Sequence, residues 1–222
     1  KKIGMLRGCL MDYFAPKTNQ ATVRLLQKCG YEVQMPEDQH CCGAIHQHNK
    51  EHERAARFAR NTIDCFNREG VTEILSNAAG CGAMMKDYGS LLSGDPDYSE
   101  KAARFSEKVK DITEFLNKST YKWQFQPVNR SVVYDEPCHL IHGQGISDEP
   151  RQLLDSIPGL KMIGLNESEM CCGSAGTFNI SQPELSIEVL KRKMENIKKS
   201  GAESVITANI GCMIQLKRGA QM

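Results

Sequence analysis

The sequence lacks several features that would assign it to a familiar functional class. Its 222 residues contain no apolar run approaching the roughly 18 residues that predict a membrane-spanning helix. The formal net charge is only +1, so the chain lacks the dense excess of Lys and Arg that is typical of nucleic-acid-binding proteins. No G-x-G-x-x-G motif follows a predicted strand, which leaves no signature of a flavin or nicotinamide site. The chain opens with Lys1-Lys2 and no signal peptide, which is compatible with an excerpt of a longer protein.

Cysteine, by contrast, is abundant, and eight of the ten cysteines form two similar sets. The tripeptide Cys41-Cys42-Gly43 recurs as Cys171-Cys172-Gly173. Each copy has one cysteine 32 or 33 residues upstream and another 39 or 40 residues downstream. Four thiolates are the ligand set of a tetrahedral metal ion or of an iron–sulfur cluster. The sequence therefore predicts two metal centres, whose candidate ligands are Cys9, Cys41, Cys42 and Cys81 in the first set and Cys138, Cys171, Cys172 and Cys212 in the second.

An even number of cysteines is also compatible with disulfide bonds. Disulfide scaffolds are usually small and rich in loops, whereas this chain has long helical and strand-like segments. A bridge between neighbours such as Cys41 and Cys42 would also be strained. Metal-bound thiolates in a reducing compartment are the favoured interpretation, which indicates a cytoplasmic protein. Cys29 and Cys65 lie outside the two sets on predicted helices, and we interpret them as buried free thiols.

The two cysteine sets belong to a duplication of the chain with an offset of 129–131 residues. The segment from Gly70 to Leu75 matches the segment from Gly201 to Ile206. Alternating strands and helices predict an α/β fold of two duplicated Rossmann-like βαβαβ halves, with parallel sheets and a pseudo-twofold relation. The predicted strands are Lys2–Leu6, Tyr31–Met35, Glu73–Ser76, Ser131–Asp135, Leu160–Leu165 and Ser204–Thr207. The predicted helices are Asn19–Lys28, Glu51–Arg68, Ser99–Asn117, Glu149–Ser156 and Gln182–Lys199.

These elements predict a first repeat over residues 1–85, a helical linker over 86–130 and a second repeat over 131–222. Every cysteine of the two sets follows the end of a predicted strand. Since the carboxyl ends of parallel strands share one edge of a sheet, we expect each set to converge on one crevice. Helices that begin at this edge would direct their N–H groups toward an anionic thiolate centre.

Iron–sulfur clusters and zinc both accept four thiolates. Two adjacent cysteines cannot easily place both sulfurs on one small ion, whereas a cluster offers separate iron atoms. The vicinal pairs therefore favour iron–sulfur clusters, and zinc in one or both halves stays an alternative. Gly43 and Gly173 would let the backbone approach the sulfide of a cluster closely.

Other polar residues near the cysteines carry weaker signals. His48 and His52 have the i, i+4 spacing of metal ligands without an evident third partner, and we interpret them as surface residues. The charged segment Lys191–Lys199 is interpreted as the solvated face of a helix. Three histidines beside the cysteine loops could tune a cluster, transfer a proton or replace a thiolate, namely His46, His139 and His142.

In its cysteine-containing segments the chain resembles the family of Cys-Cys-Gly (CCG) domain proteins. It is similar in particular to the iron–sulfur subunit of bacterial glycolate oxidase, with the lactate-utilisation iron–sulfur proteins and the CCG-containing subunit of heterodisulfide reductase as relatives. The resemblance covers essentially the whole chain and is most specific in the second half. The segments that carry it are Gly8-Cys9, HCCGA at 40–44, NAAGC at 77–81, DEPCHLIHGQG at 135–145, CCGSAGTFN at 171–179 and TANIGCMIQL at 207–216.

The chain departs from its relatives at two points. The heterodisulfide reductase pattern ends each repeat with Cys-x-x-Cys, whereas Ala78 and Asn209 occupy the first of those positions here. Four thiols in each half argue against a fused noncubane cluster and fit a 4Fe–4S centre better. The glycolate oxidase subunit also begins with a ferredoxin-like region, and this sequence has no C-x-x-C-x-x-C run.

The resemblance implies an electron-transfer subunit of a 2-hydroxy-acid oxidase that acts on glycolate or lactate at the inner face of the cell membrane. A flavoprotein partner would oxidise the substrate, and up to two clusters in this chain would pass electrons toward a quinone-type acceptor. No residue of this chain is then expected to be catalytic. Two alternatives stay open: a disulfide or quinone reductase that acts at a cluster, and a zinc-binding structural module.

Overall fold

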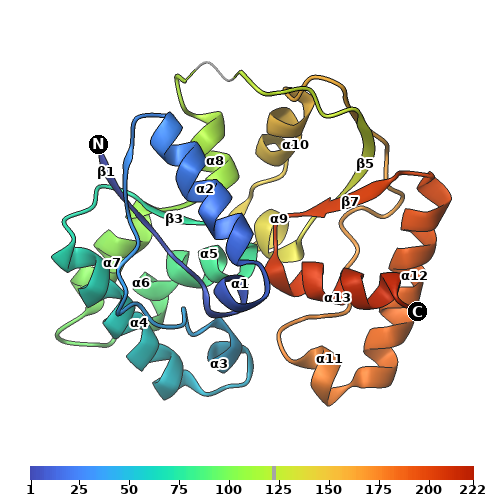
Figure 1. Ribbon diagram of the computed structural model, residues 1–222. Helices are drawn as coiled ribbons and strands as arrows, with labels where there is room; N and C mark the ends of the chain where they lie inside the picture. The colour runs from blue at the N-terminus through green and yellow to red at the C-terminus, as the bar shows by residue number, and fades with distance from the viewer. Residues whose placement is uncertain (122–123) are drawn as a thin grey trace. The chain divides into compact units, whose positions relative to one another are not determined.

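Figure 1 shows the computed structural model of the chain, which describes residues 1–121 and 124–222. The chain divides into two compact units, Lys1–Ile112 and Thr113–Met222, and each unit contains its own sheet. Helices alternate with parallel strands along both units. The predicted α/β class with two duplicated Rossmann-like halves is therefore confirmed.

The first unit is built on a four-stranded parallel sheet in the order β2-β1-β3-β4. Helix α4 packs a stripe of small and large apolar side chains into the core, with Ala55, Ala59, Ile63 and Phe66 all buried. Their spacing of three or four residues places them on one helical face. The strands are β1 (Lys2–Met5), β2 (Glu32–Gln34), β3 (Ile74–Ser76) and β4 (Val109–Asp111). The helices are α1 (Cys9–Phe14), α2 (Pro16–Lys28), α3 (Ala44–His48), α4 (His52–Arg68), α5 (Ala79–Lys86), α6 (Tyr88–Leu91) and α7 (Ser99–Lys108).

The second unit has a three-stranded parallel sheet in the order β6-β5-β7. This order corresponds to β2-β1-β3 of the first unit, so the duplication is visible in the sheet topology. The strands are β5 (Arg130–Asp135), β6 (Leu160–Met162) and β7 (Ser204–Thr207). The helices are α9 (Cys138–Gln144), α10 (Asp148–Asp155), α11 (Phe178–Ser181), α12 (Pro183–Ser200) and α13 (Ile210–Ala220), and α8 (Ile112–Asn117) begins at the boundary between the units.

The single helix predicted over Ser99–Asn117 is wrong. The structure divides this segment into α7, the strand β4 and α8, and β4 pairs with β3. Phe105, Val109, Ile112 and Leu116 follow a helical spacing, which is why the sequence pattern predicts one continuous helix. Pairing with a buried strand prevails over this local pattern, and the segment predicted as a linker thus contributes a strand to the first sheet.

The remaining predicted elements agree with the structure to within a few residues. The strand predicted over Leu160–Leu165 is shorter, because β6 ends at Met162. Among residues 1–121 and 124–222, no helix combines the length and the apolar character needed to cross a membrane.

Candidate metal centres

The first cysteine set lies beyond the carboxyl ends of the strands of the first unit. Cys9 is the first residue of α1, Cys41 and Cys42 lie in the loop between β2 and α3, and Cys81 lies in α5 after β3. The Sγ atoms of Cys9 and Cys41 are 3.7 Å apart. The thiol of Cys42 interacts with those of Cys41 and Cys81, so that the four sulfurs form a continuous row. We call this row the first quartet.

The second cysteine set repeats this arrangement in the second unit. Cys138 begins α9, Cys171 and Cys172 lie in the loop between β6 and α11, and Cys212 lies in the first turn of α13. The thiol of Cys171 interacts with those of Cys138 and Cys172, and the thiol of Cys172 interacts with that of Cys212. These four sulfurs, which we call the second quartet, therefore also form a row.

The donor set fits a centre that prefers sulfur. All ten cysteines are free thiols, and eight of them stand in the two rows. Soft thiolate ligands select iron–sulfur clusters or zinc, whereas Mg²⁺ and Ca²⁺ require oxygen. Within the described part of the chain, no three His, Cys, Asp or Glu side chains are already arranged as a site for a single ion. The quartets are the residues that would hold a sulfur-ligated centre.

The sequence pattern of the CCG family, a cysteine-rich domain, matches residues 3–86 and 132–217. The two matches contain one quartet each. The chain belongs to this cysteine-rich (CCG) domain family.

Several known proteins are similar in sequence to this chain over nearly its whole length. It is 38% identical over 223 residues to a Bacillus subtilis protein named "Probable glycolate oxidase iron-sulfur subunit", covering 100% of this chain and 50% of that protein. It is 33% identical to the "Glycolate oxidase iron-sulfur subunit" of Escherichia coli, covering 97% of this chain and 54% of that protein. It is 32% identical to "Lactate utilization protein A" of an Exiguobacterium species, covering 96% of this chain and 88% of that protein. The chain thus spans about half the length of the first two of these relatives.

Backbone and side-chain N–H groups donate to sulfurs of both quartets. The amide of Gly43 donates to Cys41 Sγ at 3.4 Å, and the amide of Gly173 donates to Cys171 Sγ at 3.3 Å. Asn209, which precedes the first residue of α13, donates to Cys212 Sγ at 3.5 Å. Such bonds stabilise negative charge on sulfur and tune the potential of a bound cluster.

The surroundings of Cys171 in the second quartet favour its thiolate form. Hydrogen bonds from Cys138 and Cys172 hold the pKa of the Cys171 thiol far below its usual range, and the Gly173 amide and the positive charge of Lys193 act in the same direction. The thiolate is the form that binds metal. Cys171 is therefore already favoured in its ligating form.

The glycines of the CCG loops have a structural role besides the one predicted. Gly43 and Gly173 both have left-handed backbones, with φ of +86° and +87°. A Cβ atom at position 173 would lie 2.6 Å from the Ser186 carbonyl oxygen of α12, and one at position 43 would lie 3.2 Å from the Ala55 carbonyl oxygen of α4. The glycines allow a tight turn and close packing of the loop on the following helix. Approach to a bound sulfide stays a prediction.

The histidines near the loops occupy varied positions. His46 packs against the ring of Phe58 at 4.9 Å between centroids, and the His139 ring nitrogen Nδ1 lies 3.7 Å from Cys138 Sγ. His48 and His52 are exposed, as predicted. Their roles toward a cluster stay predictions.

The two cysteines outside the quartets differ in their surroundings. Cys65 is a buried free thiol on α4, as predicted. Cys29 is only half-buried and follows the last residue of α2, so the prediction of a buried thiol is wrong there. Its Sγ atom donates to the Leu25 carbonyl oxygen at 3.1 Å.

We expect Cys65 to resist alkylation in the folded, metal-free protein. Burial and the neighbouring Asp38 carboxylate raise the pKa of this thiol to about 12, so at pH 8 the unreactive thiol form dominates. Iodoacetamide labelling at this pH, followed by peptide mass spectrometry, should modify Cys65 only after unfolding in urea. Equal labelling before and after unfolding would contradict the prediction.

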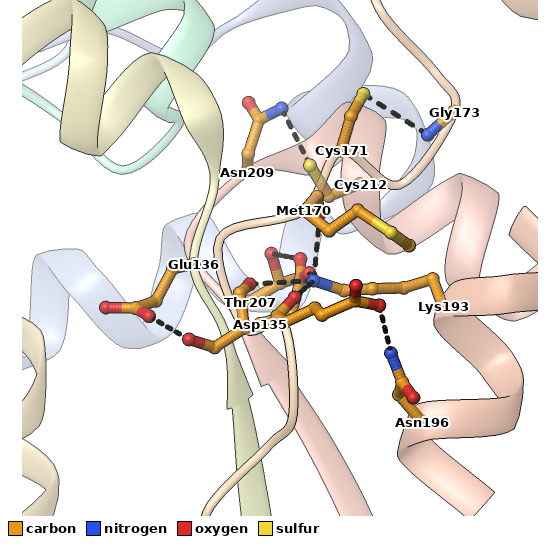
Figure 2. A network of polar contacts seen from close by, with 12 residues as sticks. Asp135, Glu136, Met170, Cys171, Gly173, Lys193, Asn196, Thr207, Asn209 and Cys212 are labelled. Atoms are coloured by element: carbon orange, nitrogen blue, oxygen red, sulfur yellow. Dashed lines mark hydrogen bonds and ion pairs between the residues drawn. The ribbon is translucent and has the colours of Figure 1, made fainter. Parts of the chain in front are cut away.

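The segment Lys191–Lys199 is not wholly a solvated helix face, because Lys193 is completely buried. Figure 2 shows its side chain extending from α12 to Asp135 and to the loop that leads into Cys171. The sequence does indicate that Lys193 faces the core, since it lies on the same helical stripe as Ser186, Leu190 and Ile197. A lysine on the inner face of a helix indicates a buried partner.

An open cavity adjoins the first quartet. It measures about 400 Å³ and exposes Cys9 beside charged and polar side chains. Its walls are Arg7, Gly8, Cys9, Asp12, Tyr13, Gln39, His40 and Cys41.

Proposed function

We propose that this CCG protein is the iron–sulfur electron-transfer subunit of a 2-hydroxy-acid oxidase or dehydrogenase. The observation that carries the proposal is the convergence of eight distant cysteines into two rows of four thiols, one in each unit. The relatives named as a glycolate oxidase subunit and a lactate utilisation protein support an iron–sulfur subunit in hydroxy-acid oxidation. We propose that each quartet holds one 4Fe–4S cluster, with zinc in one half as the alternative.

The chain's own residues would hold the centres and set their surroundings. An iron–sulfur cluster supplies a site that takes up and releases single electrons. The cysteines of each quartet provide the thiolates, and the Gly43, Gly173 and Asn209 N–H groups stabilise the charge on sulfur. Cys42 and Cys172 are only 3% and 4% exposed, so at least one thiol of each quartet is shielded from water.

The partners follow from the same proposal. A flavoprotein subunit would oxidise glycolate or lactate, and this chain would pass the electrons toward a quinone-type acceptor. This division of labour suits a cytoplasmic protein that attaches to the inner face of the cell membrane. The named functions of the relatives support the class of reaction.

Serine substitutions test the ligand assignment. We expect Cys41→Ser and Cys172→Ser each to lower the iron and sulfide content of anaerobically reconstituted protein to about half, because each removes one ligand from a different quartet. Cys65→Ser is the matched control, since Cys65 lies outside both quartets, and it should keep the full content. Electron paramagnetic resonance of the reduced proteins should show which signal is lost. Unchanged iron in both ligand variants would refute the proposal.

The cavity at Cys9 favours a second candidate function, a reductase that acts directly at the first centre. Cys9 is exposed and shares the cavity with Arg7, Tyr13 and His40, which could bind a polar substrate. An added disulfide or quinone would then change the electron paramagnetic resonance spectrum of the original protein. Arg7→Gln would alter this response to the added compound. Spectra that are insensitive to these compounds, in the original protein as well, would leave only the relay function.

A further inference from the structure

Lys193 is fully buried, and its ammonium group contacts four oxygen atoms. Nζ lies 2.7 Å from Asp135 Oδ1 at the end of β5. It also donates to the carbonyl oxygens of Ser168 at 2.7 Å, Met170 at 2.9 Å and Glu167 at 3.3 Å. A buried charge needs such compensation, because an unpaired one is strongly destabilising. The contacts therefore fix the position of the ammonium and of the groups around it.

This ammonium contacts two of the segments that carry thiols of the second quartet and reaches the third through Asp135 (Figure 2). Asp135 precedes Cys138 by three residues, and Met170 is the neighbour of Cys171. Thr207, five residues before Cys212, donates from Oγ1 to Asp135 Oδ2 at 2.9 Å. One lysine–aspartate pair thus connects the end of β5, the loop before Cys171 and the end of β7.

The loop that Lys193 holds has an unfavourable backbone conformation. Glu167 has a φ of +54°, which side chains other than glycine rarely adopt. Neighbouring residues of α12 bind its carboxylate, since Arg192 pairs with it and Asn196 donates to Oε2 at 2.8 Å. Helix α12 therefore keeps the approach to Cys171 in a shape that the loop alone would not favour.

The first unit has no equivalent charge pair at the corresponding positions. The offset of 129 between Cys9 and Cys138 places Leu6 opposite Asp135, and the offset of 131 between Gly70 and Gly201 places Thr62 opposite Lys193. Leu6 and Thr62 are both buried.

Neutral hydrogen bonds through α2 connect the segments that follow β1 and β3 in the first unit. Asn77 Nδ2 donates to Asn19 Oδ1 at 3.0 Å and to Thr22 Oγ1 at 3.2 Å. Asn19 donates in turn to the Arg7 carbonyl oxygen at 2.8 Å. The two units therefore hold their quartets by different chemistry.

We propose that Lys193 is the positioning residue of the second quartet, and that the first quartet needs no such charge. Lys193 acts on the thiols through the loop carbonyls and Asp135, and it holds the three segments at the spacing that a sulfur-ligated centre requires. This inference rests on the proposed function, because it assumes that the second quartet binds an iron–sulfur centre.

The variants for the test separate the loop contacts from the ion pair. Lys193→Met removes both, whereas Asp135→Asn leaves Lys193 with its three carbonyl acceptors. Lys193→Met/Asp135→Leu removes both charges and avoids leaving one of them alone in the core. Thr62→Val changes the corresponding position of the first unit and is the matched control.

The measurement is the iron and sulfide content of each full-length variant after anaerobic reconstitution, with electron paramagnetic resonance to identify the centre that is lost. We expect Lys193→Met to fall to about half, like Cys172→Ser, because only the second centre is lost. Asp135→Asn and Thr62→Val should keep both centres. The double variant should melt near the original metal-free protein and still contain about half of the iron.

Two results would overturn the inference. In one, Lys193→Met keeps the full iron content and both resonance signals while Cys172→Ser loses half. In the other, the double variant recovers the second centre together with its melting temperature, which would make Lys193 a stabilising residue only. Failure of the proposed function has a different signature, since Cys41→Ser and Cys172→Ser would then leave the iron content unchanged.

Discussion

Lys193→Met should lower the free energy of unfolding of the second unit by roughly 3–5 kcal/mol in the metal-free protein. Lys193 and Asp135 are 0% and 2% exposed at their side chains, and they form an ion pair at 2.7 Å. Removing the lysine leaves the carboxylate in the core with Thr207 as its hydrogen-bond donor, and it takes one donor away from three loop carbonyls. The Glu167 and Ser168 oxygens keep a backbone donor each, from the Met170 and Glu136 amides. Both losses act in the same direction, so this is the largest effect that we expect from a single substitution.

Hydrogen exchange followed by mass spectrometry can assign this loss to the second unit. Peptides from β5 and β7 should exchange faster in Lys193→Met, whereas peptides from β1 and β3 should keep their protection. Lys193→Met/Asp135→Leu should recover most of the stability, because well-packed apolar residues can replace a buried ion pair. Equal unfolding midpoints for Lys193→Met and the original protein in urea would show that the pair contributes little.

Gly173→Ala is expected to destabilise the second unit by about 2–5 kcal/mol. The backbone φ of +87° is strained for alanine, and the added Cβ would meet the Ser186 carbonyl oxygen at 2.6 Å. The backbone of the loop has to shift to relieve this clash, and Cys171 and Cys172 shift with it. The second centre should therefore be lost as well, which iron analysis would report as a fall to about half.

Substitutions at two other glycines separate the cost of backbone strain from the cost of the steric clash. Gly201→Ala tests a left-handed backbone alone, because nothing lies within 4 Å of its Cβ position, and it should cost about 1–2 kcal/mol. Gly43→Ala has a similar φ of +86° and a milder contact of 3.2 Å with the Ala55 carbonyl oxygen, so its cost should fall between the other two. Urea unfolding of the three variants measures the loss of stability in each and so gives their order. A Gly173→Ala protein as stable as Gly201→Ala would show that the loop and α12 can move apart.

The parallel pairing of the strands and the meeting of the quartets could be predicted from the sequence because both depend on the order of elements along the chain. Cys9 and Cys81 each follow a buried strand, and parallel strands bring their carboxyl ends to one edge whatever the details of packing. The duplication adds a second instance of the same pattern, with Cys138 and Cys212 after β5 and β7. Neighbouring sulfurs in each quartet interact as this reasoning requires.

Features that depend on tertiary packing escaped the sequence reasoning. The spacing of Phe105, Val109 and Ile112 suits a helix, but Val109 pairs with Ile74 in the sheet. Lys193 belongs to a charged segment, and although its helical stripe indicates an inward position, its partner Asp135 is shown only by the tertiary structure. Gly173 could be identified as necessary, but the reason is its contact with Ser186, which is distant in sequence.

The strand β4 has a practical consequence for anyone who wishes to study the halves separately. It comes from the segment between the two family matches, yet it borders β3 in the first sheet. A fragment that stops at residue 86 would leave one side of β3 with unpaired backbone groups, a surface prone to self-association. A cut after Ile112 keeps the first sheet whole, and it is the natural place to divide the gene for separate expression of the two units.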